Sequence, residues 1–197
     1  MELMVVIGII AVLLVAVLPA INSVSKSGGR KAAVGNLLGA IEQARVLAIK
    51  GGHPTYIVFP AQLPSGGDPA NSERYAYRSF AIFEDDLETA GTTKQVTPWK
   101  TLPTGISIRT ASLANLGNSL SFMFNPSNAA APFPFLKFNS NGEVDGASTP
   151  NASTGPIEIK VFEGSVSAGA DIATSRDRNL SETVSIARLT GRASQIP

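Results

Sequence analysis

Hydrophobic and polar positions divide the chain into two unequal parts. The first is the uncharged run from Leu3 to Ser25, which is dominated by apolar side chains. A run of this length predicts a membrane-spanning helix, because about 20 residues at ~1.5 Å rise cross the ~30 Å hydrocarbon core. One acid, Glu2, directly precedes the run, and a carboxylate at such a position needs a partner or a role. The sequence after residue 26 has the polarity of a soluble domain.

From Arg30 to Lys50 the pattern becomes that of an amphipathic helix. Its apolar residues recur every three or four positions, at Ala33, Leu37, Ile41, Ala44 and Ala48. Gly51-Gly52 is expected to end the helix, and Pro54 prevents its return. Earlier in the chain, Pro19 removes one helical hydrogen bond and Gly28-Gly29 weakens the join between the two halves. The single apolar stripe predicts that the second half packs on a sheet.

The sequence from residue 55 onward predicts short strands separated by loops. We expect strands at Thr55–Phe59, Arg74–Phe83, Gly105–Thr110, Leu120–Phe124, Phe135–Phe138, Ile157–Phe162 and Thr183–Leu189, which are rich in β-branched and aromatic residues. Residues 60–71 and 125–134 each hold three prolines and predict loops. Asn139–Gly142 predicts a tight turn. The small polar residues of 164–177 predict a further loop.

This order of elements predicts an α+β fold, with one long N-terminal helix laid on a mostly antiparallel sheet. We expect three parts: a membrane or filament-core helix over 1–25, its amphipathic continuation over 26–52, and a β-rich head over 53–197. Composition adds little. The net charge is +1, from 16 Lys and Arg against 15 Asp and Glu, so no polyelectrolyte partner is implied. The absence of cysteine excludes thiolate metal sites and cysteine nucleophiles.

The first residues resemble a known N-terminal segment. The stretch Glu-Leu-Met-Val-Val-Ile-Gly-Ile-Ile from Glu2 to Ile10, with Pro19 further along, resembles the start of type IV pilins and type II secretion pseudopilins. In that family a basic leader ending in Gly is followed by a Phe-Thr-Leu-x run, and the glutamate comes directly after the x residue. Met1 takes the place of the residue before the glutamate, so we expect the leader to be encoded upstream. The resemblance implies that Glu2 pairs with the N-terminal amine of a neighbouring subunit.

Two other interpretations of the N-terminus remain open. A cleaved signal peptide has a basic start and an apolar core of 7–15 residues, whereas this segment has an acidic start and a longer core. A plain membrane anchor explains the length but not Glu2.

The positive-inside rule would place the head in the cytoplasm, because Lys26, Arg30 and Lys31 follow the anchor. A basic leader of the pilin type would reverse that orientation.

Interior segments resemble the GspH/FimT-type minor pseudopilins in particular. Ala44-Arg45-Val46-Leu47-Ala48 is similar to the family's Ala-Arg-x-x-Ala at the helix end, and Trp99–Gly105 to its Trp-x-x-Leu-Pro-x-Gly. Phe138–Gly142 is similar to its Phe-x-x-x-Gly turn, and Thr190-Gly191-Arg192 to its closing Thr-Gly-Arg. These motifs occur in the family's order, at both ends of the chain and between them. The insertions around 60–72 and 125–134 have no counterpart.

The resemblance implies a structural subunit, of minor type, in a type II secretion pseudopilus or type IV pilus. Its implied partners are other pilin subunits, the inner membrane, and the prepilin peptidase and assembly platform. The implied location is the bacterial inner membrane with a periplasmic head, and then a filament. The alternative is a membrane-anchored periplasmic binding domain that does not polymerise.

The remaining candidate sites have simpler explanations. Glu84, Asp85, Asp86 and Glu88 could bind calcium, but their spacing lacks the Asp-x-Asp-x-Asp-Gly pattern, so we expect a solvated loop. Some FimT-type proteins bind DNA through Gly-Arg-x-Arg, and Arg192 is followed by no second arginine. His53, the only histidine, lies in a Gly-Gly-His-Pro turn without further ligands or a triad. Trp99 and the phenylalanines are expected to fill the core. No cofactor and no enzymatic activity are predicted.

Overall fold

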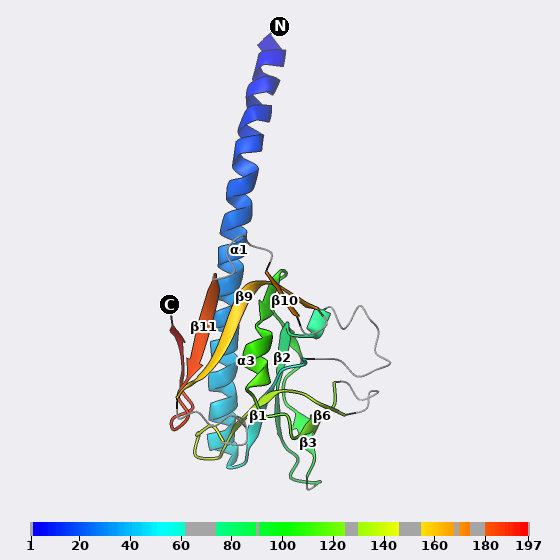
Figure 1. The fold of residues 1–197 in the computed structure, drawn as a ribbon, viewed down its shortest axis with the longest axis vertical. Coiled ribbons are helices and arrows are strands. Elements are labelled where there is room, and N and C mark those ends of the chain that lie inside the picture. The colour runs from blue at the N-terminus through cyan, green and yellow to red at the C-terminus, as the bar shows by residue number, and fades with distance from the viewer. Residues whose placement is uncertain are drawn as a thin grey trace.

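The computed structural model describes residues 2–61, 74–89, 91–124, 130–145, 155–167, 170–173 and 180–196, with the side chains of 6–8, 10 and 28–51 in the N-terminal helix. The chain begins with α1, which extends from Glu2 to Gly51. Its first half projects away from all strands, and its second half lies against them (Figure 1). The helix ends where predicted, at Gly51, and the next residue, Gly52, has a φ of +69°. Pro19 does not end the helix.

The second half of α1 provides the centre of the main core. All five apolar positions predicted from the sequence are 0% exposed, namely Ala33, Leu37, Ile41, Ala44 and Ala48. They pack with apolar residues of the strands in one cluster. The amphipathic interpretation of this segment is therefore confirmed. From here on, the head is a larger unit than the predicted residues 53–197: it is the second half of α1 together with all strands.

The strands form two antiparallel sheets and one small hairpin. The first sheet has the order β3-β2-β1-β8 with β4 beside β2; the bounds are β1 Thr55–Val58, β2 Ser79–Asp85, β3 Thr93–Gln95, β4 Lys100–Thr101 and β8 Phe135–Phe138. The second has the order β10-β9-β11-β12 with β5 beside β9; the bounds are β5 Ile106–Ile108, β9 Ile157–Ser167, β10 Ala170–Ala173, β11 Ser181–Ile186 and β12 Ala193–Ile196. The hairpin pairs β6 (Ser121–Phe122) with β7 (Ala131–Pro132). The predicted α+β fold is confirmed.

The central strands of the first sheet, β1, β2 and β8, are largely buried on both faces. Ile57, Ile82 and Leu136 face the cluster built around α1. Their neighbours along the strands face a second, aromatic cluster: Tyr56, Val58, Ala81, Phe83, Phe122, Phe124, Phe133 and Phe135. Trp99 stacks on Phe124 at 5.2 Å between ring centroids, and its indole N–H donates to the Phe124 carbonyl at 2.8 Å. The expectation that the aromatic residues fill the core is confirmed.

Several predicted strand boundaries were wrong. Residues 74–78 form helical and other turns, and β2 starts only at Ser79. Tyr77 has a φ of +57°, a left-handed conformation that interrupts an extended chain. Thr110 begins a short helix, α3 (Thr110–Ala114), rather than ending a strand.

The predicted loop over 164–177 was also wrong in its first part. There β9 continues to Ser167 and pairs with β10, from Gly164↔Ala173 to Ser167↔Ala170. Antiparallel pairing uses backbone groups, so small polar residues can take part in it. Residues 174–177, and most of the predicted proline-rich loops, lie outside the described residues.

Tyr56 connects the aromatic cluster to the acidic end of β2. Its hydroxyl donates to Asp85 Oδ1 at 2.7 Å. Burial, and then this hydrogen bond, raise the pKa of Tyr56 well above its usual value of about 10. The folded state therefore holds this proton more tightly than the unfolded state. Its contribution to stability is complete below about pH 10 and is lost as the pH rises toward the folded pKa.

We expect Tyr56→Phe to lower the free energy of unfolding by about 1 kcal/mol at neutral pH, since Asp85 loses its donor. The variant should also lose less stability than the parent chain between about pH 10 and pH 11. Denaturant titrations at several pH values, followed by the fluorescence of Trp99, measure both effects. An identical alkaline slope in both proteins would contradict the assignment.

Candidate assembly surface

The projecting half of α1 exposes large apolar side chains. Val6, Ile7 and Ile10 are 54%, 58% and 51% exposed. Exposed apolar side chains in a row are typical of surfaces that bind lipid or other proteins. The helix includes Glu2 and Pro19, whose side chains lie outside those described. The roles of these two residues therefore remain predictions.

A different part of α1 satisfies the length and hydropathy of a membrane span. Among residues with described side chains, the segment long and apolar enough to cross a membrane is Gly28–Gly51. Its apolar stripe lies in the core of the head, as Ala33, Leu37 and Ile41 show at 0% exposure. We therefore interpret this segment as the core helix of the head. The predicted span over 3–25 stays a prediction, because most of its side chains lie outside those described.

Where α1 enters the head, an ion pair holds it to the second sheet. Arg30 Nη1 donates to Glu163 Oε1, and the two side chains are only 12% and 7% exposed. On the same turn, Gly29 lies against Pro103 and Ile106; an added Cβ would be 3.7 Å and 3.6 Å from their side chains. The Trp99–Gly105 passage thus contributes a contact with the helix. Sequence reasoning missed the ion pair, since 133 residues separate its partners.

At the other end of the head, three of the resemblance motifs meet at Arg45. Its Nε donates to the Thr190 carbonyl at 2.6 Å, and its Nη1 lies 3.0 Å from Glu42 Oε1. Gly191 lies so close to Gly142 that an added Cβ would be 2.1 Å from the Gly142 carbonyl oxygen. The helix end, the Phe138–Gly142 turn and the C-terminal turn are therefore one packed unit.

The outer face of α1 within the head contacts no other described element at several positions. An added Cβ at Gly35 or Gly39 would have no heavy atom within 4 Å. Further along, Val46 and Ile49 are 48% and 45% exposed. Small residues allow close approach of another helix, and exposed apolar ones favour it. Among the described side chains, α1 thus exposes apolar or small residues both on its projecting half and within the head.

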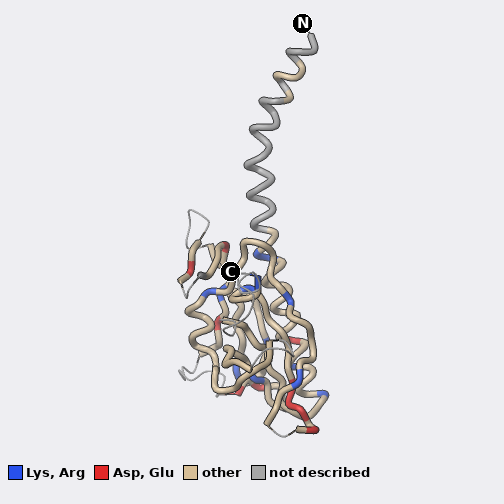
Figure 2. The backbone as a smooth tube through the Cα atoms, turned by 90° about the vertical axis from the view of Figure 1, so that its right-hand side faces the viewer, with Lys and Arg blue, Asp and Glu red and all other residues tan. Residues whose placement is uncertain are grey.

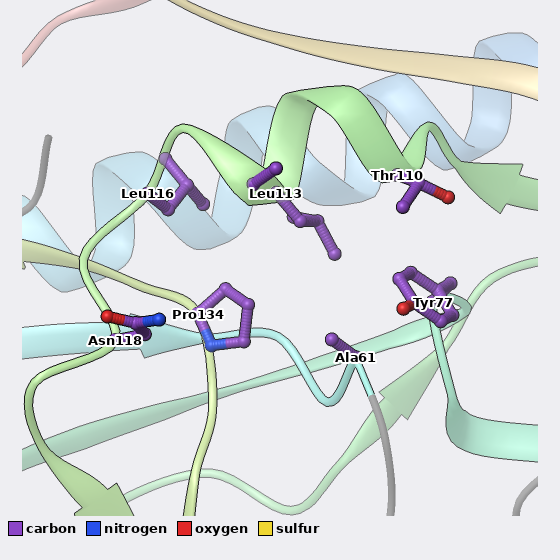
Figure 3. A pocket seen from close by; sticks show the side chains of 8 residues that line it. Ala61, Tyr77, Thr110, Leu113, Leu116, Asn118 and Pro134 are labelled. Carbon is purple, nitrogen blue, oxygen red and sulfur yellow. The ribbon is translucent and has the colours of Figure 1, made fainter. Parts of the chain in front are cut away.

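A small cavity lies between α3 and the loops at the ends of β1 and β8 (Figure 3). Its volume is about 150 Å³, and it is lined by Ala61, Tyr77, Thr110, Leu113, Ala114, Leu116, Asn118 and Pro134. Burial and the charge of Asp171 raise the pKa of Tyr77. The Thr110 hydroxyl already donates to Asp171. Tyr77 is the one titratable side chain of the lining, so these residues form no acid–base or nucleophile–base pair.

The acidic residues singled out in the sequence do not converge on one point. Asp85 accepts from Tyr56, while Asp86 accepts from the Glu88 backbone N–H at 3.0 Å. Among the described residues, which include all four acids, no three His, Cys, Asp or Glu side chains could hold a metal ion. Arg192 is exposed on the C-terminal turn. His53 lies in the turn after α1, as expected.

Comparison with known proteins gives two kinds of result. Neither a family model nor a curated protein sequence matches the chain. Among solved structures, the chain is similar to the minor pseudopilin EpsH of the Vibrio cholerae type 2 secretion system. One EpsH structure shares 12% identity over 85% of this chain and 95% of that chain, with a TM-score of 0.44. The other shares 13% over 86% and 94%, with a TM-score of 0.45.

The chain is also similar to the type IV minor pilin FimU of Pseudomonas aeruginosa. The identity is 13% over 87% of this chain and 90% of that chain, and the TM-score is 0.43. At these identities the likeness concerns the fold alone.

Proposed function

We propose that the chain is a non-enzymatic structural subunit of a pilin-like filament, a minor pilin or pseudopilin. The observation that carries the proposal is the division of α1 into two halves. One half fills the core of the head, whereas the other projects with exposed Val6, Ile7 and Ile10. Such a helix must bury its projecting half elsewhere, first in a bilayer and then among the helices of other subunits.

The motifs of the pilin resemblance support this proposal. A carboxylate moving into an apolar filament core must pair with a positive group, since an unpaired buried charge is costly. The N-terminal amine of a neighbouring subunit supplies such a group for Glu2. The proposed partners are pilin subunits, the inner membrane, the prepilin peptidase and the assembly platform. The head would be periplasmic, and the machine a type II secretion system or a type IV pilus.

We expect Glu2→Ala to leave the head folded and to reduce incorporation into filaments at least tenfold. The measurement is the fraction of tagged full chain recovered in sheared filaments relative to the membrane fraction. Glu158→Ala is the matched control, because Glu158 is a half-exposed head residue whose ion-pair partner among the described residues is Lys160, at 3.6 Å. Normal incorporation of Glu2→Ala would exclude the proposed role of Glu2.

The alternative function, an anchored binding domain that does not polymerise, makes a different prediction for the parent chain. The cavity beside Tyr77 is the one observation that favours it, since it offers room for a small group. In that case the parent chain would stay in the membrane fraction and be absent from sheared filaments. The same fractionation therefore separates the two functions.

A further inference from the structure

Two leucines are the most exposed large apolar side chains among those described. Leu189 is 81% exposed and Leu87 is 78% exposed. Each lies in a turn between two strands, Leu87 between β2 and β3 and Leu189 between β11 and β12. Single exposed apolar residues need no explanation, but in both turns described residues next to the leucine form hydrogen bonds. Ordered turns with an exposed apolar residue are suited to binding, since little entropy is lost on contact.

The turn that carries Leu87 is acidic. Asp86 and Glu88 flank the leucine, and we name Asp86–Glu88 the acidic tip. The Asp86 backbone N–H donates to the Thr92 carbonyl at 2.9 Å, which closes the hairpin. The Glu88 N–H donates to Asp86 Oδ1 at 3.0 Å. The tip lies at the end of the head farthest from the N-terminus, where acidic residues gather (Figure 2).

The turn that carries Leu189 is basic. Leu189–Arg192, which we name the basic turn, has an exposed Arg192 beside the leucine. The Gly191 N–H donates to the Ala187 carbonyl at 2.8 Å, and Arg45 binds the Thr190 carbonyl. The turn packs on Gly142, which in turn lies against the half-exposed Ile49 of α1. Its leucine is therefore presented by a well-packed part of the head.

We propose that the acidic tip of one copy of the chain docks on the basic turn of a second copy. Leu87 and Leu189 would pack together, with Asp86 and Glu88 facing Arg192. Charge selects this pairing, because two acidic tips or two basic turns would repel each other. The proposal rests on the proposed function, in that it requires copies of the chain to meet in the assembly.

The geometry of the two turns gives this contact a direction. Both lie in the half of the head farthest from the N-terminus, on different flanks of it (Figure 1). Because the two surfaces differ, the contact is heterologous and leaves one acidic tip and one basic turn unoccupied at the ends of any open chain of copies. Contacts of this kind form rings or helical filaments rather than closed twofold dimers.

Disulfide trapping tests the contact, since the natural chain has no cysteine. Leu87→Cys and Leu189→Cys are placed in two full-length copies with different tags, mixed in detergent micelles and oxidised with diamide. We expect the mixed disulfide at a yield at least fivefold above that of Leu87→Cys with Met123→Cys. Met123 is a control because it is 57% exposed but carries no flanking charge. Equal yields for the two pairs would overturn the proposal.

Charge reversal gives a second, independent result. With the cysteines in place, Glu88→Lys or Arg192→Glu alone should lower the yield at least threefold. Combining Glu88→Lys in one copy with Arg192→Glu in the other should restore most of it. Failure of the combination to restore the yield would contradict the pairing.

If the chain enters filaments but the mixed disulfide does not form, the contact is wrong and the proposed function stands. If the disulfide forms in micelles but the chain is absent from filaments, the proposed function is wrong and the contact stands.

Discussion

Glu163→Ala is expected to destabilise the head by about 3–5 kcal/mol, because it leaves the Arg30 guanidinium largely buried without its carboxylate. Arg30 is 12% exposed and Glu163 is 7% exposed, so water has little access to the guanidinium. The measurement is a urea titration of the full chain in detergent micelles. Trp99, the only tryptophan, reports unfolding of the head.

The matched control replaces both members of the pair. Arg30→Met together with Glu163→Leu removes both buried charges and keeps apolar volume, so its stability should lie within about 1 kcal/mol of the parent chain. The Lys160–Glu158 pair gives a second comparison, since its side chains are 41% and 46% exposed. Removing Glu158 should cost about 0–1 kcal/mol. A loss below about 1 kcal/mol for Glu163→Ala would show that solvent screens the Arg30 pair.

The sequence predicted the elements whose pattern is local. The stripe from Ala33 to Ala48 has helical spacing and is buried as expected, and β8 lies at the predicted residues Phe135–Phe138. The run Thr55–Phe59 is apolar on both sides, and in the structure β1 is buried on both faces. The short strands β3, β4 and β12 were missed, because their residues are mostly exposed and carry no hydrophobic period.

The site depends on contacts that the sequence does not encode locally. The resemblance gave the motifs around Arg45, Gly142 and Gly191 in order, but not that they meet. Their meeting depends on the register of β11 with β9 and β12, which brings the C-terminal turn to the end of α1. The Arg30–Glu163 pair likewise joins residues 133 positions apart. The first half of α1 differs from these contacts, because it could be recognised locally. Its long uncharged run alone indicated that it does not pack in the core of the head.

Gly191→Ala should destabilise the head by about 3 kcal/mol or more, because two costs add. Gly191 has a φ of +62°, where an L-residue with a side chain costs about 1 kcal/mol or more. Its Cβ would also lie 2.1 Å from the Gly142 carbonyl oxygen and 3.1 Å from Arg45 Cδ. The oxygen belongs to the backbone, so relief requires the Phe138–Gly142 turn and the Leu189–Arg192 turn to move apart. Urea titration of the full chain followed by Trp99 fluorescence measures the loss.

Gly105→Ala separates the two costs. Gly105 has a φ of +79°, yet an added Cβ there would have no heavy atom within 4 Å. Its replacement should therefore cost only the backbone term, about 1–2 kcal/mol. The difference between the two variants measures the close approach of the C-terminal turn to the Gly142 turn. Equal losses of unfolding free energy in the two variants would show that the C-terminal turn and the Gly142 turn are farther apart than in the structure. The rigid presentation of Leu189 would then lose its support, since the same packing holds that turn in place.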